Sequence, residues 1–184
     1  LGQHFLINQG ALGKIISDHE LIQLRIAETE KYAHITYFFN GYRDKQFNNE
    51  YRILLPSKNV TRHDEFPEMM AKEISSRLIE SINQGGFEFI LANFANPDMI
   101  AHTGNYDAGL QTIAVVDEEI TKILRACIEK DAILIITSDH GNIEQMTDPF
   151  TGQPETKHDP NLVPIYIVGK GFERLKTEAE IDFI

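Results

Sequence analysis

The chain has 184 residues, of which 42% are hydrophobic and 24% charged, and its formal net charge is −11. These proportions suit a globular domain with its own core, and the acidic balance argues against a nucleic-acid partner. No apolar run approaches the roughly 20 residues that cross a bilayer, so no membrane partner is expected. The one cysteine, Cys127, excludes a disulfide framework and fits a cytoplasmic protein.

The first half of the chain alternates between helical and strand patterns. We expect a short helix over residues 11–17, an aromatic and β-branched strand over residues 33–39, and a second strand over residues 51–55. A helix is then predicted from residue 66 to residue 84, with Pro67 in its first turn. Its apolar positions recur every four residues, at Met70, Ile74, Leu78 and Ile82.

The second half continues the alternation with longer elements. We expect a strand over residues 87–94, a long helix from the N-cap Asn105 to about residue 130, and strands over residues 133–136 and 163–168. The buried stripe of the long helix is predicted at Leu110, Ile113, Ala114, Ile120, Leu124 and Cys127. A polar loop with Gly, Pro and Thr fills residues 148–160. This order predicts layered α/β structure with right-handed crossovers.

The strand at residues 133–136 leads directly into Asp139 and His140. Its unbroken apolar run is typical of a strand buried on both faces, as in a parallel sheet between helices. Such sheets place ligand chemistry beyond the carboxyl ends of their strands. A carboxylate beside an imidazole can bind a divalent metal there. Taken alone, the pair favours a helix N-cap at Asp139 followed by a surface histidine, and the metal site is expected only because of the rest of the chain.

Two further segments after predicted strands carry side chains of the same kind. Asp98 and His102 have the i, i+4 spacing that places two side chains on one helix face. His158 lies in the polar loop. Oxygen and imidazole ligands without a thiolate suit Mn²⁺, Zn²⁺ or Mg²⁺. The sequence therefore predicts a metal site built from three loops.

Several long segments resemble the cofactor-independent (2,3-bisphosphoglycerate-independent) phosphoglycerate mutases. They are residues 24–34 (LRIAETEKYAH), 37–41 (YFFNG), 96–105 (NPDMIAHTGN), 139–146 (DHGNIEQM) and 151–154 (TGQP), followed by His158 and Val163-Pro164. The resemblance runs from about residue 11 to residue 170. It implies a member of the alkaline phosphatase superfamily, with a three-layer α/β/α domain, a mostly parallel sheet and a two-metal phosphotransferase site.

The resemblance also implies roles for individual residues. Asp98, His102 and His158 match the ligands of one Mn²⁺, and Asp139 and His140 match part of the shell of a second. Lys31 matches the family's lysine that contacts the substrate phosphate. By its chemistry alone, Lys31 would be taken for a solvated surface charge.

The sequence departs from the family at the nucleophile. The family's early segment with an Asp ligand and a Ser nucleophile, and its inserted domain that holds the glycerate, have no match here. None of the serines has the nucleophile's context; they are Ser17, Ser57, Ser75, Ser76, Ser81 and Ser138. We therefore interpret residues 1–184 as the C-terminal part of a mutase that interconverts 3- and 2-phosphoglycerate through a phosphoserine. We expect the sheet to be incomplete at its N-terminal side, the missing N-terminal portion to be a partner, and the chain alone to be inactive.

Two other functions remain open on the sequence. One is a stand-alone metal-dependent phosphatase or phosphodiesterase of the same superfamily, which would use metal-activated water in place of the serine. The other is a non-catalytic metal-binding module. The ETEKYAH segment at residues 28–34 favours the mutase over both.

Overall fold

The computed structural model describes residues 10–172. Its helices are α1 (Leu12–Asp18), α2 (Thr29–Ala33), α3 (Ala71–Gln84), α4 (Asn96–Ala101) and α5 (Tyr106–Glu129). Its strands are β1 (Gln23–Glu28), β2 (Glu50–Leu55), β3 (Phe89–Ala92), β4 (Leu134–Thr137) and β5 (Ile165–Val168). A π-helix covers His34–Phe38, and short 3₁₀ turns cover His63–Glu65 and Ile143–Gln145.

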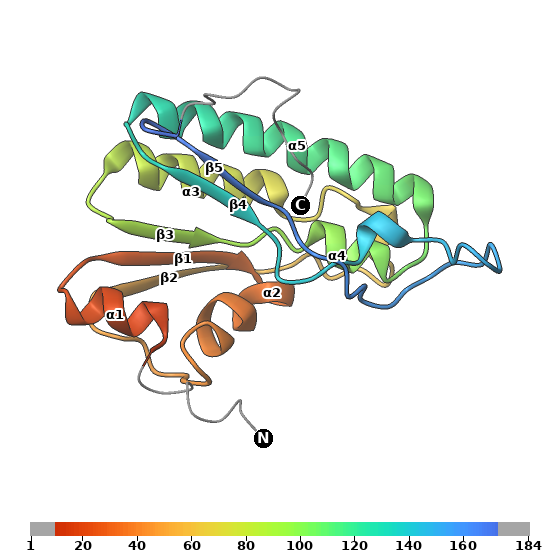
Figure 1. Cartoon of the computed structure of the whole chain (residues 1–184), viewed down its shortest axis with the longest axis horizontal. Coiled ribbons are helices and arrows are strands. Elements are labelled where there is room, and N and C mark those ends of the chain that lie inside the picture. The colour runs from red at the N-terminus through yellow and green to blue at the C-terminus, as the bar shows by residue number, and fades with distance from the viewer. Residues whose placement is uncertain (1–9, 173–184) are drawn as a thin grey trace.

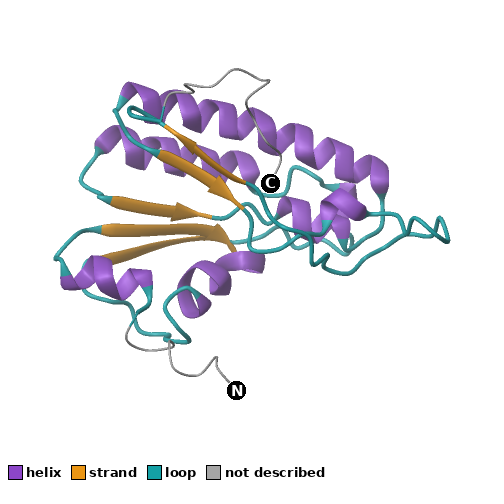
Figure 2. Cartoon of the chain, viewed as in Figure 1, coloured by secondary structure: helices purple, strands orange, loops and turns teal. Residues whose placement is uncertain are grey.

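The strands form two sheets that lie between helices. β2, β1 and β3 make a parallel sheet in that order, and β4 pairs with β5 in antiparallel fashion. The helices α3 and α5 lie on one side of the strands, while α1 and α2 lie beside β1 and β2 on the other (Figure 1). The α/β class and the parallel sheet are as predicted, and the arrangement has three layers (Figure 2).

β1 is the central strand of the parallel sheet, and the sequence did not reveal it. All six of its residues are buried, including the polar Gln23 and the charged Arg25 and Glu28. A buried strand is usually predicted from an unbroken apolar run in the sequence, and the polar residues of β1 interrupt that run. The Arg25 guanidinium lies between the rings of Phe39 and Phe89, at 4.7 and 5.1 Å from their centroids.

The main core lies between the parallel sheet and the helices α3 and α5. Its buried members are Leu24, Ile26, Ile74, Leu78, Ile123 and Cys127. The predicted stripe of α3 is confirmed, since Ile74 and Leu78 are buried while Met70 and Ile82 pack at the edge of this core. The helix begins at Ala71 rather than at residue 66, because the preceding residues form turns.

The predicted buried stripe of α5 is largely wrong. Leu110 and Ile113 are 57% and 44% exposed, and Cys127 is the only predicted member that is fully buried. The buried side instead carries small and polar residues, such as Ala108 and Thr112. The Thr112 hydroxyl donates to the carbonyl of Pro67 at 2.6 Å, so a polar side chain lies inside at no hydrogen-bonding cost. The predicted N-cap is confirmed: the Asn105 side chain accepts from the backbone N–H of Ala108.

The predicted strand at residues 33–39 is also wrong, since this segment is helical. α2 continues into the π-helix His34–Phe38, in which Phe39 N–H donates to the carbonyl of His34. The Thr36 hydroxyl donates to the carbonyl of Tyr32 at 2.7 Å, which supports the helical backbone. Packing overrides the strand propensity of the aromatic and β-branched side chains.

β4 begins and ends within a residue of its predicted range, but it is not buried on both faces. Ile133 and Ile135 are 54% and 57% exposed on one of its faces. β3 and β5 are shorter than predicted, and residues 148–160 form a loop, as expected. In the part of the chain that the structure describes, no helix is long and apolar enough to cross a membrane.

Candidate metal centre

The predicted ligands meet at the carboxyl edge of the strands. Asp98 lies on α4, which follows β3, and Asp139 and His140 directly follow β4. Lys31 lies on α2, directly after β1. The bridge between Gly141 and Asp159 brings the loop with His158 to the same edge. Four segments that are far apart in the sequence therefore contribute to one site.

Asp98, His102 and His158 are in direct contact. The Nε2 atoms of His102 and His158 lie 3.1 and 3.3 Å from Oδ1 of Asp98. The two Nε2 atoms are 3.1 Å apart. The i, i+4 spacing of Asp98 and His102 works as predicted, because α4 ends at Ala101 and His102 keeps helical backbone angles.

The surroundings of this triad favour a bound cation. Nδ1 of His102 lies 2.7 Å from the carbonyl oxygen of Thr156, which can only accept, so Nδ1 carries the proton. In the neutral ring, Nε2 then presents a lone pair to Asp98 and His158. Asp98 Oδ1 and the Nε2 atoms of His102 and His158 lie within 3.3 Å of one another, and with His158 in its Nδ1–H tautomer all three can donate an electron pair to one cation. This donor set of one oxygen and two imidazole nitrogens fits a divalent metal.

Asp98 is held by groups that favour its charged form. Burial alone would raise the pKa of Asp98, but hydrogen bonds from Lys31 and Asn142 and the charge of Lys31 outweigh it and lower the pKa to about 2. The Asn142 side-chain amide donates to Oδ1 at 2.7 Å. Asp98 is therefore a carboxylate at any physiological pH.

Lys31 is buried and faces the same ligands. Its Nζ lies 2.7 Å from Asp98 Oδ2, 3.3 Å from Asp139 Oδ2 and 3.4 Å from His140 Nε2. Only 4% of its side chain is exposed, so the reading as a solvated surface charge is wrong. An ammonium group is thus fixed beside the ligand cluster.

The two predicted ligand groups adjoin each other. Asp139 Oδ2 lies 3.5 Å from Nε2 of His140, and the rings of His140 and His158 stack at 3.7 Å. Ligand atoms of Asp98, His140 and His158 all lie within 4.8 Å of one another. His140 is therefore near both groups, and how the ligands divide between two metals stays a prediction.

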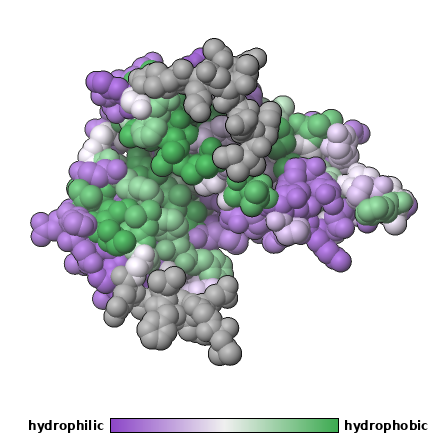
Figure 3. All heavy atoms as spheres, viewed as in Figure 1, coloured by the Kyte–Doolittle hydropathy of each residue, from purple (hydrophilic) through white to green (hydrophobic). Residues whose placement is uncertain are grey.

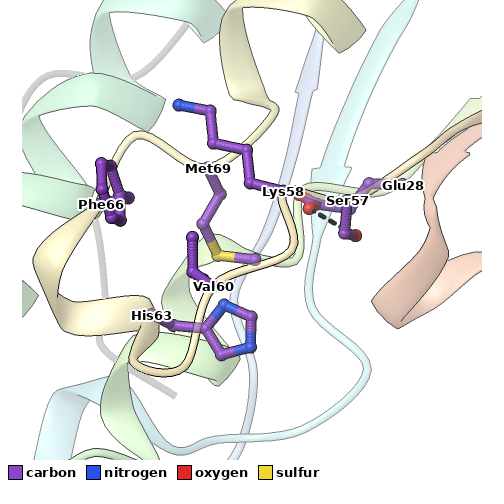
Figure 4. A pocket seen from close by; sticks show the side chains of 7 residues that line it. All are labelled: Glu28, Ser57, Lys58, Val60, His63, Phe66 and Met69. Atoms are coloured by element: carbon purple, nitrogen blue, oxygen red, sulfur yellow. Dashed lines mark hydrogen bonds between the residues drawn. The ribbon is translucent and has the colours of Figure 1, made fainter.

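The sequence did not single out two other members of this edge. Asn142 is buried against Asp98. Its position directly after Asp139-His140-Gly141 is the sequence feature from which it could have been predicted. Glu28 is fully buried beside a small pocket, where its Oε2 accepts from the Ser57 hydroxyl at 2.9 Å (Figure 4). Its Oε1 has no hydrogen-bond partner, and burial raises the pKa of Glu28. His63 is half-buried and lines the same pocket.

Among the sequence models of known protein families, that of the metalloenzyme superfamily matches residues 8–182 of this chain. The chain belongs to this superfamily. Its parallel sheet, and a carboxyl edge lined with Asp and His, agree with a metal-dependent enzyme domain.

Named relatives of this metalloenzyme domain are cofactor-independent mutases. It is 48% identical over 158 residues to the 2,3-bisphosphoglycerate-independent phosphoglycerate mutase of Francisella tularensis subsp. novicida, covering 86% of this chain and 31% of that protein. It is 45% identical over 173 residues to the enzyme of the same name from Clostridium kluyveri, covering 94% and 34%. The match is to the C-terminal part of such enzymes. The chain spans about a third of the length of the relatives it matches.

Solved structures give the same assignment. The domain superposes on the phosphoglycerate mutase of Leishmania mexicana, crystallised at low cobalt concentration, with a TM-score of 0.82 and 30% identity. That match covers 88% of this chain and 32% of the other. The PH0037 protein of Pyrococcus horikoshii has a TM-score of 0.52 at 16% identity, covering 85% of this chain and 40% of that one, which shows a shared fold alone. The resemblance to the mutases and the predicted fold class are confirmed.

Proposed function

We propose that this chain is the C-terminal, metal-binding part of a cytoplasmic phosphoglycerate mutase that does not use 2,3-bisphosphoglycerate. Such an isomerase acts in glycolysis and gluconeogenesis, with phosphoglycerate as its small-molecule substrate. The observation that carries the proposal is the meeting of Asp98, His102, Asp139, His140 and His158 with the buried Lys31 at one sheet edge. The identity to the mutases over most of the chain supports it.

The residues of this chain would hold the metal and the phosphate. Asp98, His102 and His158 would hold one Mn²⁺, and Asp139 and His140 would contribute to a second, with Zn²⁺ or Mg²⁺ as alternatives. A bound metal supplies positive charge for the phosphoryl group and lowers the pKa of an attacking hydroxyl. Lys31 adds a fixed positive charge beside the ligands, which suits a phosphate oxygen.

Two described serines that follow strands, Ser138 after β4 and Ser57 after β2, donate hydrogen bonds within the chain. The Ser138 hydroxyl donates to the carbonyl of His140 at 2.6 Å, and the Ser57 hydroxyl donates to Glu28. Neither has the sequence context of the family's nucleophile. We therefore expect this chain by itself to bind metal but not to interconvert 3- and 2-phosphoglycerate.

The test uses the purified chain, stripped with a chelator and reloaded with Mn²⁺. Metal content and a calorimetric titration measure binding, and two assays measure conversion of 3-phosphoglycerate and hydrolysis of p-nitrophenyl phosphate. One tight site with neither activity supports the proposal. Turnover of p-nitrophenyl phosphate that His158→Ala abolishes would point to a stand-alone phosphatase, and conversion of 3-phosphoglycerate would contradict the expected inactivity.

A further inference from the structure

His34 lies one helical turn after Lys31, where α2 passes into the π-helix His34–Phe38. Its backbone angles are helical (φ −64°, ψ −42°), so the i, i+3 spacing places its side chain on the same helix face as Lys31. Lys31 reaches the candidate ligands from this face. π-Helices are rare, and they are frequent at functional sites. The position of His34 therefore makes it a candidate member of the site.

The charged groups of the site act on His34. The pKa of His34 is lowered from the ordinary value of 6.5, first by burial and then by the charge of Lys31, while the carboxylates of Asp98 and Asp139 oppose this shift. The ring is therefore neutral at physiological pH. Figure 3 shows hydrophilic surface over the loops of the molecule and hydrophobic surface over the strands. An anionic ligand suits the polar end of the molecule to which His34 belongs.

The two ring nitrogens of His34 have different surroundings. Nδ1 is buried and has no hydrogen-bond partner in residues 10–172. Nε2 is not buried, and no described residue hydrogen-bonds to it. A buried N–H without an acceptor is rarer in proteins than a buried acceptor without a donor. The proton of the neutral ring is therefore expected on Nε2, which makes the accessible nitrogen a hydrogen-bond donor.

Packing fixes the ring that carries this donor. The rings of His34 and Phe38 meet edge to face, with their centroids 5.4 Å apart. A fixed N–H is directional, whereas a lysine ammonium acts as a compact point charge with rotatable donors. His34 and Lys31 thus offer two complementary contacts to an anion: one gives orientation and the other gives charge.

We propose that His34 is a further substrate-binding residue, whose Nε2–H donates to an oxygen of the same phosphoryl group that Lys31 contacts. The inference rests on the proposed function, because it requires that this edge takes a phosphate ester. A phosphoryl group spreads its negative charge over several oxygens during transfer, so a second donor stabilises it beyond what Lys31 supplies.

The first experiment determines the tautomer in the metal-free chain. Nitrogen NMR of isotope-labelled histidine separates protonated from unprotonated ring nitrogens, and the signals of His34 are those that disappear in His34→Phe. We expect the proton on Nε2 and a bare Nδ1. A proton on Nδ1 would overturn the inference, because Nε2 would then have no hydrogen to donate.

The second experiment titrates inorganic phosphate into the chain loaded with Zn²⁺, with calorimetry as the readout. His34→Phe keeps a ring against Phe38 but removes the donor, and it should weaken phosphate binding about tenfold or more. His34→Gln places an amide N–H near the position of Nε2 and should bind phosphate almost as tightly as the parent. His19→Phe is the matched control, since His19 is exposed after α1. The Zn²⁺ affinity of all variants should equal that of the parent.

The outcomes separate this inference from the proposed function. Phosphate binding by His34→Phe as tight as in the parent, or equal losses in His34→Phe and His34→Gln, would overturn the role of His34 alone. Weaker Zn²⁺ binding by His34→Phe would do the same, because His34 would then shape the metal ligands. A parent that binds Zn²⁺ but no phosphate would overturn both. If His34→Phe does not fold, an Nε2 signal that phosphate leaves unshifted in the Zn²⁺-loaded parent, as judged with His34→Gln for assignment, would overturn the inference.

Discussion

At the scale of single residues, Lys31 sets the electrostatics of the candidate metal centre. Its ammonium lies within 3.4 Å of Asp98, Asp139 and His140. It neutralises the carboxylates in the metal-free chain, but it also repels a dication that would bind the same atoms. Lys31 therefore stabilises the empty site at the expense of metal affinity.

We predict that Lys31→Met destabilises the metal-free chain by roughly 2–4 kcal/mol, because two carboxylates lose their buried counter-ion. Mn²⁺ should bind the variant several-fold more tightly and restore most of the stability. Urea unfolding with and without Mn²⁺ measures both effects. The control is Lys58→Met, which removes an exposed pair with Glu68 and should cost less than about 1 kcal/mol. Weaker Mn²⁺ binding by Lys31→Met would mean that Lys31 positions the ligands instead of competing with the metal.

From the burial of Glu28 we predict a pH dependence of the stability whose sign is opposite to that expected for a salt-bridged carboxylate. Burial raises the pKa of Glu28 above the ordinary value of 4.5, so the folded chain keeps this proton longer than the unfolded chain does. Stability is then lost as the pH rises from about 4.5 through the raised pKa. Glu28→Gln should be more stable than the parent at pH 8, with the difference vanishing below pH 4.5. Thermal unfolding across this range is the measurement, with the exposed Glu129→Gln as control; a gain that is the same at every pH would exclude ionisation of Glu28 as its cause.

At the scale of elements, the N-cap of α5 joins the longest helix to the loop before α3. The Asn105 side chain accepts from Ala108 N–H and donates to Asp64 Oδ2 at 3.0 Å. We predict that Asn105→Ala costs about 1–2 kcal/mol, since a cap and a side-chain hydrogen bond are lost together. Asn105→Ser should recover about half, because it keeps the cap alone. Urea unfolding compares both with Asn83→Ala on the exposed face of α3; equal stabilities of the Ala and Ser variants at position 105 would show that the cap contributes nothing.

The sequence predicted the elements that follow simple periodicity and the residues that follow a motif. α3, the cap of α5 and β4 were expected near their observed bounds, and the predicted ligands meet at one edge. β1 was missed because Gln23, Arg25 and Glu28 interrupt its apolar pattern, although all are buried. The wrong stripe of α5 has a related cause: the helix has apolar residues on two sides, and a single helix pattern does not say which side faces the core. The contacts of Asn142 and Thr156 depend on a folded loop, which no local pattern specifies.

At the scale of the whole molecule, the candidate metal centre lies where two sheets that share no strand pair meet. Asp98 and His102 follow β3 of the parallel sheet, whereas Asp139 and His140 follow β4. His158 reaches the site from the loop before β5. A bound metal would therefore cross-link the two halves of the strand layer, and metal binding should stabilise the entire fold rather than one loop.

We predict that Mn²⁺ raises the free energy of unfolding of the whole chain in one cooperative transition, by about 2.7 kcal/mol at a hundredfold excess over its dissociation constant. His158→Ala should lose most of this gain, because the triad with Asp98 and His102 loses one of its ligands. His19→Ala is the matched control, since this histidine is exposed after α1, before β1 begins, whereas the ligands lie at the carboxyl edge of the strands, and the variant should keep the full gain. Chelation should return the parent and the control to the metal-free transition. If His158→Ala kept the full gain, His158 would not be a ligand; if only part of the chain were stabilised, the metal would not join the two sheets.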